Sequence, residues 1–285
     1  MSNNNIESIL ALFSKQQFNE ALDAVQELIA NDPNDALLFN IQGACYAGLN
    51  KFILAKESYI KAITLNPDYA KAHYNLAGAL YELNDFDDSI QSYQNALAIE
   101  SDYAEAHNNL GNVFKAKGQL DLAIKSYGTA IDLKPDYIES HYSLGTSFYE
   151  SGKLKETVKC YERVLEFRPN FTEIHNNLGN VLKELGRLDD AVLSYKTAIS
   201  IDPDFVEVYF NLGTTFQELN QLTDAVKHYK KAIEIKPNYP EAHNNLGVAF
   251  KELKEFDSAR SAYQMAINIK PDYAEAHNNI GIVFR

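Results

Sequence analysis

Residues 104–137 read AEAHNNLGNVFKAKGQLDLAIKSYGTAIDLKPDY, and this stretch decides the fold. In its first part, His107, Leu110 and Phe114 follow one another at spacings of three and four, which places them on one face of a helix. Its second part has an apolar face of the same kind. That face comprises Ala123, Tyr127, Ala130 and Ile131. The stretch therefore predicts two amphipathic helices.

The two predicted helices are separated and ended by residues that suit those places. Gly118 interrupts the chain between them. Pro135 ends the second, because proline lacks an N–H group and its ring clashes with the preceding turn of a helix. The stretch is thus predicted to be a helix–turn–helix hairpin.

The same pattern recurs along the chain with a period of 34 residues, the separation of Pro33 and Pro67. Three residue types keep this period independently, which marks a repeat architecture. The prolines are Pro33, Pro67, Pro135, Pro169, Pro203, Pro237 and Pro271, with Ser101 in the remaining slot. The histidines are His73, His107, His141, His175, His243 and His277, with Tyr209 in the gap. The tyrosines are Tyr59, Tyr93, Tyr127, Tyr161, Tyr195, Tyr229 and Tyr263.

We number the positions of each repeat from 1 to 34. First residues are Ala36, Ala70, Ala104, Ile138, Thr172, Val206, Pro240 and Ala274. The prediction is a single solenoid over residues 1–285. It has a degenerate repeat at 2–35, seven full repeats at 36–273 and a truncated ninth repeat at 274–285.

Position 8 is small in each full repeat, as at Gly111 and Gly179. Glycine inside a helix costs about 1 kcal/mol relative to alanine, so its recurrence needs a structural reason. We expect two backbones to approach closely here, with the tyrosine of position 24 packed beside them. Since one hairpin cannot bury its apolar face alone, neighbouring hairpins must stack. The fold class is therefore all-α, a solenoid of helical repeats.

The pattern resembles the tetratricopeptide repeat family in its length and in its spaced Leu-Gly, aromatic, alanine and proline positions. It departs from that family in having histidine at position 4, in Ser101, and in the first copy, where Val25 replaces the tyrosine. The resemblance implies a right-handed superhelix. It also implies that the first helices line a concave groove that binds peptides or proteins.

Position 6 carries asparagine in six of its seven occurrences from Asn75 onward, and Ser143 is the exception. Asparagine is a mediocre residue inside helices. Its amide can both donate to and accept from the backbone of an extended peptide. The row resembles the asparagine ladder in the repeat arm of O-linked N-acetylglucosamine transferase, although family descent alone could also have preserved it. The predicted groove residues here are Asn75, Asn109, Asn177, Asn211, Asn245 and Asn279.

Positions 5 and 12 alternate between neighbouring repeats, so the structural unit could be a pair of 68 residues. Position 5 alternates Asn108, Asn176 and Asn244 with Tyr74, Tyr142 and Phe210. Position 12 provides Lys115, Lys183 and Lys251 in every second repeat. We expect asparagines to hold the ligand backbone and aromatic rings to accept its side chains. The alternative is that these rings simply pack against the neighbouring first helix.

Charge gives only a weak indication of the ligand. The chain has 26 Lys and Arg against 39 Asp and Glu, a net charge of −13, which argues against non-specific binding to nucleic acids. Position 2 is Lys71 in one repeat and glutamate in every later one. The helix dipole alone favours these glutamates, but they also favour a ligand with some basic residues. They argue against the carboxylate clamp of the family's co-chaperones, which needs Lys and Arg at positions 2 and 6.

The sequence predicts neither catalysis nor a cofactor. The histidines at position 4 stand one repeat apart, and packed helices lie about 8–10 Å apart, too far for one zinc ion. We expect them to be hydrogen-bonded packing residues. Cys45 and Cys160 are interpreted as small apolar residues. No run approaches the roughly 20 apolar residues of a membrane helix, and a cytoplasmic location is the expectation.

The leading prediction is a non-enzymatic scaffold for protein interaction that binds an extended peptide or partner segment in its groove. One alternative is the recruitment arm of a larger enzyme, for example a glycosyltransferase, with a catalytic domain beyond residue 285. Another is a solenoid that assembles end to end. That alternative uses the truncated ninth repeat, where Ile280, Val283 and Phe284 lack a covering second helix.

Overall fold

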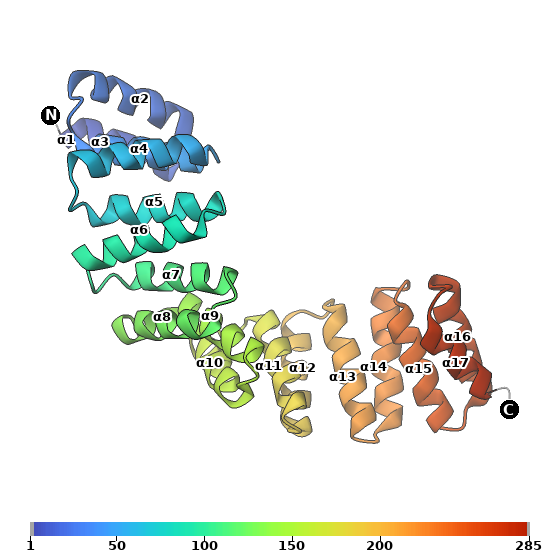
Figure 1. Cartoon of the computed structure of the whole chain (residues 1–285). Coiled ribbons are helices and arrows are strands. Elements are labelled where there is room, and N and C mark those ends of the chain that lie inside the picture. Colours follow the sequence, from blue (N-terminus) through green and yellow to red (C-terminus); the bar gives the residue numbers. More distant parts are fainter. Residues whose placement is uncertain (1–2, 284–285) are drawn as a thin grey trace. The chain divides into compact units, whose positions relative to one another are not determined.

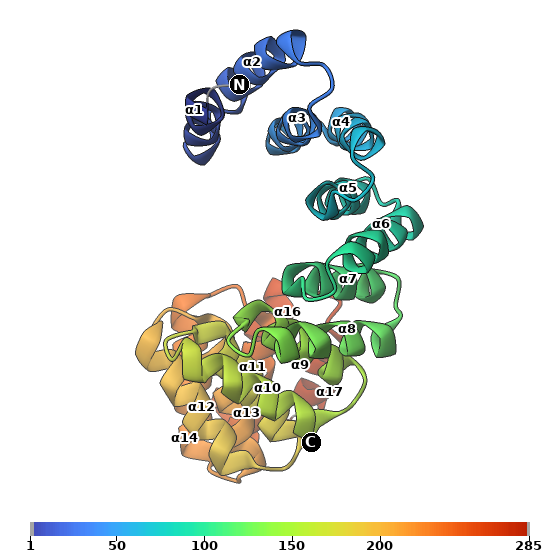
Figure 2. The same ribbon diagram turned by 90° about the vertical axis from the view of Figure 1, so that its left-hand side faces the viewer.

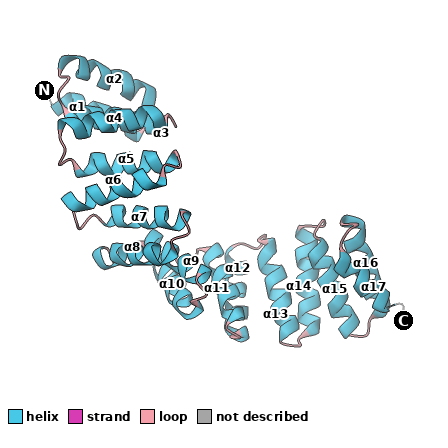
Figure 3. Cartoon of the chain, viewed as in Figure 1, coloured by secondary structure: helices cyan, strands magenta, loops and turns pink. Residues whose placement is uncertain are grey.

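A computed structural model of the chain describes the fold of residues 3–283 and the side chains of residues 6–283. Every regular element in this range is an α-helix (Figure 3). The helices form two compact units, residues 1–147 and 148–285, each described here by itself. The first unit contains α1 (Asn3–Ser14), α2 (Phe18–Asn31), α3 (Ala36–Gly48), α4 (Phe52–Leu65), α5 (Ala70–Glu82), α6 (Phe86–Ile99), α7 (Ala104–Ala116) and α8 (Leu120–Leu133).

Helix α9 (Ile138–Glu150) includes the boundary between the units, and the second unit continues from it (Figure 1). Its helices are α10 (Leu154–Phe167), α11 (Thr172–Glu184), α12 (Leu188–Ile201), α13 (Val206–Glu218), α14 (Leu222–Ile235), α15 (Pro240–Glu252), α16 (Phe256–Ile269) and α17 (Ala274–Val283). Odd-numbered helices from α3 to α17 begin at the first residues that the sequence period indicated. The predicted all-α repeat solenoid is therefore confirmed.

Within each hairpin the turn is made by position 15, which has a left-handed backbone. Gly118 has φ 72°, as the sequence indicated for a break between helices. Asn50, Asn84 and Asn220 take the same conformation, which asparagine tolerates better than most residues. The second helix folds back on the first, as α4 does on α3, and then packs on the first helix of the next repeat, as α4 does on α5 and α14 does on α15.

The small residue at position 8 makes room for a tyrosine ring. A Cβ atom on Gly111 would lie 2.6 Å from Cε1 of Tyr127, and one on Gly179 would lie 2.5 Å from Cε1 of Tyr195. These rings are fully buried. The sequence correctly paired positions 8 and 24, but the expected reason needs correction. The atoms nearest the missing Cβ belong to the tyrosine ring and not to a second backbone.

The histidines at position 4 are hydrogen-bonded packing residues, as expected. Their Nε2–H groups donate to the backbone carbonyl of position 32, over 2.9 Å from His73 to Pro67 and 2.8 Å from His175 to Pro169. A carbonyl oxygen can only accept, so the proton must lie on Nε2. The same bond is made by His107, His141, His243 and His277. In these six repeats it ties the start of the first helix to the loop that precedes it.

First helices of successive repeats lie side by side. In the first unit α3 contacts α5 and α5 contacts α7, and these helices follow one side of the hairpins while α4, α6 and α8 follow the other (Figure 2). In the second unit α11, α13, α15 and α17 make the same series of contacts. The first helices therefore present a continuous row within each unit, the geometry that a groove along them requires.

The predicted apolar surface of the ninth repeat is described in part. Ile280 and Val283 are half-buried, and Ile282 is exposed. Phe284 lies outside the described residues. In the part of the chain that the structure covers, no helix has the length and apolar character needed to cross a bilayer.

Candidate functional site

The position 6 asparagines are half-buried and occupy equivalent places on the first helices. Asn75 lies on α5, Asn109 on α7 and Asn177 on α11. Asn211, Asn245 and Asn279 continue the series on α13, α15 and α17. Because first helices contact one another within each unit, their amides form a row with a spacing of one repeat. We call this set the asparagine row.

A hydrogen bond reaches from the asparagine row to position 5 of the preceding repeat. Nδ2 of Asn75 donates to Oδ1 of Asn40 over 2.9 Å, and Nδ2 of Asn109 donates to the hydroxyl of Tyr74 over 2.9 Å. The same bond joins Asn211 to Asn176 and Asn279 to Asn244, both over 3.0 Å. It fixes the direction of these four amides. An amide has a second N–H and two oxygen lone pairs, so capacity for a ligand remains.

The position 5 asparagines lie deeper than the sequence indicated. Asn108, Asn176 and Asn244 are buried, and Asn244 has no exposed surface. Oδ1 of Asn108 accepts from the hydroxyl of Ser140 over 2.8 Å, and Nδ2 of Asn244 donates to Oε1 of Glu275 over 3.0 Å. Little of their surface is open to solvent, and the expectation that they hold the ligand backbone stays a prediction. They form a supporting layer beneath the asparagine row.

The position 5 aromatic residues pack on other rings of the chain. Tyr74 stacks on Tyr103 with centroids 4.8 Å apart, and it meets Tyr93 edge-on at 5.7 Å. The ring centroid of Phe210 lies 5.1 Å from that of Tyr239. Both Tyr74 and Phe210 remain half-buried, so they combine a packing role with a partly open surface. Tyr142 is the most open of the three, at 38% exposed.

The position 12 lysines are tied to the next repeat. The ammonium of Lys115 donates to the hydroxyl of Thr146 over 2.9 Å, and that of Lys183 donates to Thr214 over 3.0 Å. The Thr at position 9 alternates in step with this lysine, a signal that sequence analysis missed. Lys251 has no equivalent hydroxyl, because position 9 of the ninth repeat is Ile282.

Sequence analysis also missed the aromatic residue at position 34, which ends each repeat next to the glutamate of position 2. Burial, then Glu105 and Glu100, raise the pKa of Tyr103 to about 12. Burial, then Glu207 and Glu241, raise the pKa of Tyr239 to about 12. The phenol groups therefore stay neutral and lie close to carboxylates. The signal was an aromatic residue every 34 positions from Tyr69 to Tyr273.

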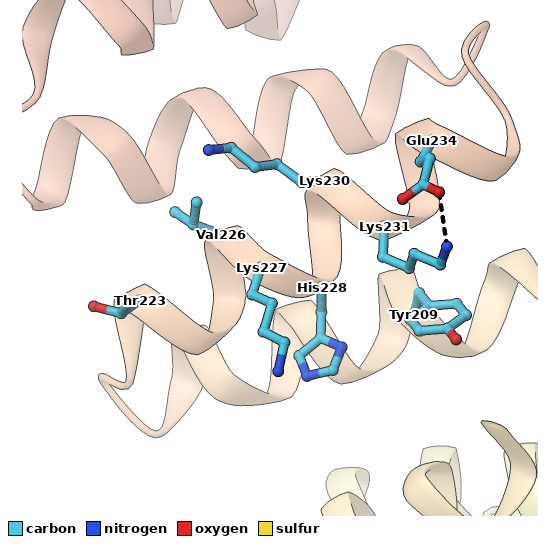
Figure 4. Close-up of a pocket in the computed structure, with 8 residues that line it drawn as sticks. All are labelled: Tyr209, Thr223, Val226, Lys227, His228, Lys230, Lys231 and Glu234. Carbon is cyan, nitrogen blue, oxygen red and sulfur yellow. Dashed lines mark hydrogen bonds and ion pairs between the residues drawn. The ribbon is translucent and has the colours of Figure 1, made fainter. Parts of the chain in front are cut away.

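A pocket of about 670 Å³ lies beside α14 (Figure 4). Its lining includes Lys227, His228 and Lys231 from α14 and Tyr209 from α13, and Lys231 is paired with Glu234 at 2.9 Å. Equivalent positions of α10 and α16 line pockets of about 400 and 570 Å³. The hollow therefore belongs to the repeated surface of the second helices and contains none of the predicted groove residues.

His228 distinguishes this pocket from its equivalents. The centroid of its imidazole ring lies 6.1 Å from that of the Tyr209 ring and 5.3 Å from that of the Phe216 ring. The buried Nδ1 atom has no hydrogen-bond partner. Burial, followed by the nearby Lys227, lowers the pKa of His228 to about 4. The ring is therefore neutral at pH 7 and packs as an aromatic residue.

The described residues offer no arrangement for metal binding or thiol chemistry. Within residues 3–283, no three His, Cys, Asp or Glu side chains lie close enough to hold a metal ion. Cys45 and Cys160 are buried free thiols, and burial raises the pKa of each to about 11. At neutral pH they are protonated and therefore poor nucleophiles.

Comparison with known families agrees with the repeat geometry. The family model described as TPR repeat matches residues 77–118, 111–150, 145–186, 179–220, 215–254 and 249–284. A second model, described as tetratricopeptide repeat, matches residues 38–69. Together these matches cover most of the chain.

Two curated relatives match shorter stretches. The peroxisomal targeting signal receptor of Saccharomyces cerevisiae is 30% identical over 80 residues, which are 28% of this chain and 13% of the receptor. The heat shock protein sti1 homolog of Schizosaccharomyces pombe is 32% identical over 77 residues, 27% of this chain and 13% of that protein. The chain thus spans only a small part of the relatives that it matches.

Solved structures reproduce the fold over longer stretches. YrrB, described as a TPR protein with an unusual peptide-binding site, is 27% identical with a TM-score of 0.60, over 66% of this chain and 96% of YrrB. The C-terminal part of a TPR repeat-containing protein from Cytophaga hutchinsonii has a TM-score of 0.63 at 18% identity. It covers 96% of this chain and 98% of that one, and this likeness concerns the fold alone.

Proposed function

Because the chain belongs to the tetratricopeptide repeat family, we propose that it is a scaffold for protein interaction which binds an extended peptide or partner segment along its first helices. The observation that carries this proposal is the asparagine row, in which four of the amides are held in one direction by bonds to the preceding repeat, those of Asn75, Asn109, Asn211 and Asn279. The peptide-binding site named for YrrB supports the same function.

The proposed mode of binding uses the row as a series of polar contacts to the ligand backbone. First helices in contact lie about 8–10 Å apart, and an extended chain advances about 3.3–3.6 Å per residue, so one repeat spans roughly three ligand residues. A net hydrogen bond contributes about 0.5–1.5 kcal/mol, whereas association costs an estimated 4–15 kcal/mol. Side-chain contacts must therefore add to the row. The exposed ring of Tyr142 and the half-buried ring of Phe210 provide them, whereas the ring of Tyr74 is covered on one face by Lys71.

The ligand in this proposal includes basic residues, because glutamate fills position 2 from Glu105 onward and lies close to the tyrosines of position 34. The protein acts in this proposal by holding its partner and performs no reaction of its own. Two of the similar proteins, the peroxisomal targeting signal receptor and YrrB, are named for binding. They support a binding module over the two alternatives, an arm of a larger enzyme and a solenoid that assembles end to end.

The test removes three amides of the asparagine row together, as Asn109→Ala, Asn177→Ala and Asn245→Ala. A peptide that the wild type captures from a peptide array serves as the fluorescent probe. We expect its affinity, measured by anisotropy, to fall at least about tenfold, since three net hydrogen bonds are lost. The melting temperature should change little.

The matched control replaces three asparagines of second helices, Asn31, Asn95 and Asn268, by alanine. This variant loses the same number of amides outside the row and should bind the probe as the wild type does. Equal affinity of both triple variants for the probe would contradict the proposed role of the asparagine row.

A further inference from the structure

The chain itself places a lysine on one of its aromatic pairs. The ammonium of Lys71 lies 4.5 Å from the ring centroid of Tyr74 and 5.7 Å from that of Tyr103. It also donates to the hydroxyl of Tyr103 over 2.9 Å. A cation over an aromatic face is attracted by the negative charge of the ring face. Positions 2, 5 and 34 together thus form a complete cation site, occupied by the protein's own residue.

The same aromatic pair recurs in the second unit without its lysine. Phe210 and Tyr239 lie 136 residues, four repeats of 34, after Tyr74 and Tyr103. Their ring centroids are 5.1 Å apart, close to the 4.8 Å of the first pair. Position 2 of this repeat is Glu207, so a carboxylate has replaced the ammonium. The ring separation is nearly kept, with ring planes 36° apart instead of 25°, and the charge beside the pair is reversed.

The surroundings of this second pair are acidic on the side of position 2. Glu207 and Glu241 are the two carboxylates that act on the Tyr239 hydroxyl, and Glu207 is exposed. Lys236 lies 4.8 Å from the ring centroid of Tyr239. Lys134 and Lys270 make the same contact with Tyr137 and Tyr273, so that lysine belongs to the repeated loop. Among the described residues, no lysine or arginine lies over Phe210.

We propose that Phe210, Tyr239 and Glu207 form a subsite for a lysine side chain of the bound segment. The ammonium lies over the ring of Phe210, donates a hydrogen bond to the hydroxyl oxygen of Tyr239 and pairs with the carboxylate of Glu207. This is the position that Lys71 takes over Tyr74 and beside the Tyr103 hydroxyl. The inference rests on the proposed function, since it assigns one residue of the ligand.

The subsite can be tested with a minimal ligand that does not need the asparagine row. The probe is the capped tripeptide acetyl-Ala-Lys-Ala-amide, titrated into protein with labelled Phe and Tyr rings and followed by NMR. We expect the ring signals of Phe210 and Tyr239 to shift and those of Tyr74 and Tyr103 to stay in place, since Lys71 already occupies the first pair. The same peptide with norleucine in place of lysine should leave all four rings unshifted.

Two reciprocal substitutions exchange the charges that stand at position 2 beside the two aromatic pairs. Glu207→Lys gives the second pair its own ammonium and should weaken the response of Phe210 to the lysine peptide at least about fivefold. Lys71→Glu empties the first pair, so Tyr74 and Tyr103 should begin to respond. Both substitutions are at exposed positions, and circular dichroism checks that the helices persist.

Equal shifts with the lysine and norleucine peptides, or an unchanged response in Glu207→Lys, would overturn the subsite. So would the lack of any shift at Phe210 in the wild type. These results leave the proposed function standing if the asparagine triple variant still loses its array peptide. Loss of the proposed function appears in that separate assay, so the two failures can be told apart.

Discussion

Tyr263 lacks a hydrogen bond that its counterparts make. The hydroxyls of Tyr127 and Tyr195 donate to Asn112 and Asn180, which stand at position 9 of their repeats, over 2.8 and 2.7 Å. The hydroxyl of Tyr263 is buried and has no partner. Position 9 of its repeat is Val248, which cannot accept a hydrogen bond. A buried hydroxyl without a partner lowers stability, since it has lost its bonds to water.

Val248→Asn should therefore stabilise the protein. It supplies the acceptor that Asn112 and Asn180 supply, and the gain should be about 1 kcal/mol in the free energy of unfolding. Urea denaturation measures it. The control makes the same change in a Tyr263→Phe background, where no hydroxyl remains to donate. A gain of the same size in both backgrounds would show that the hydrogen bond is not its source.

At the scale of single residues, the sequence predicted pairs that share one repeat better than pairs that join two repeats. The contact of Gly111 with Tyr127 was predicted because both residues recur with one period. The bond from Lys115 to Thr146 was not, because it depends on which side chains meet across two separate first helices. The burial of Asn244 was missed for the same reason, since its partners are in the next repeat.

The helical hairpin owes its turn to one residue in a left-handed conformation. Gly118, Gly152 and Gly186 adopt it without a steric penalty, whereas Lys254 adopts it with φ 64°. A side chain in this region places Cβ close to the following carbonyl, at a cost of about 1–2 kcal/mol. The hairpin of α15 and α16 is thus held by the least suitable turn residue of the second unit.

Lys254→Gly should relieve that strain and raise the free energy of unfolding by about 1 kcal/mol. Thermal or urea unfolding provides the measurement. Lys125→Gly, at an exposed position inside α8, is the matched control and should lose about 1 kcal/mol instead. The explanation fails if the two substitutions change stability in the same direction.

The boundaries of the elements were largely readable from the sequence, because glycine, asparagine and proline recur where the chain turns. Repeat starts such as Ala70 and Pro240 coincide with the first residues of α5 and α15. The turn at Lys254 was not readable in the same way, since lysine has no preference for a left-handed backbone. Lys254 can be identified as the turn residue only because it stands at position 15 of its repeat.

At the scale of the whole molecule, each helix contacts mainly its neighbours along the chain. In the second unit α11 packs on α12, and α12 on α13, while contacts between first helices reach only the adjacent repeat. Solenoids of this kind distribute their stability over repeats and the interfaces between them. A local defect should therefore remain local.

Gly179→Ala tests this, because its Cβ would lie 2.5 Å from the ring of Tyr195. We expect a loss of about 1–3 kcal/mol from overpacking. Amide hydrogen exchange should become faster in α11, α12 and their neighbours α10 and α13, and remain unchanged in α16. Gly281→Ala is the control at the same position of the ninth repeat, where nothing lies within 4 Å of the added Cβ. Uniformly faster exchange through α16 would contradict nearest-neighbour coupling.

The bonds that Asn75, Asn109, Asn211 and Asn279 make to the preceding repeat run in one sense, from the amide Nδ2 back toward the N-terminal side of the chain. The row therefore has a direction, which is set by these hydrogen bonds. A peptide has a polarity too, since its N–H and C=O groups follow in a fixed order. A peptide laid along the row in one orientation therefore meets different hydrogen-bonding groups than in the other, and a surface built from similar repeats can still distinguish the N-terminal from the C-terminal direction of its ligand.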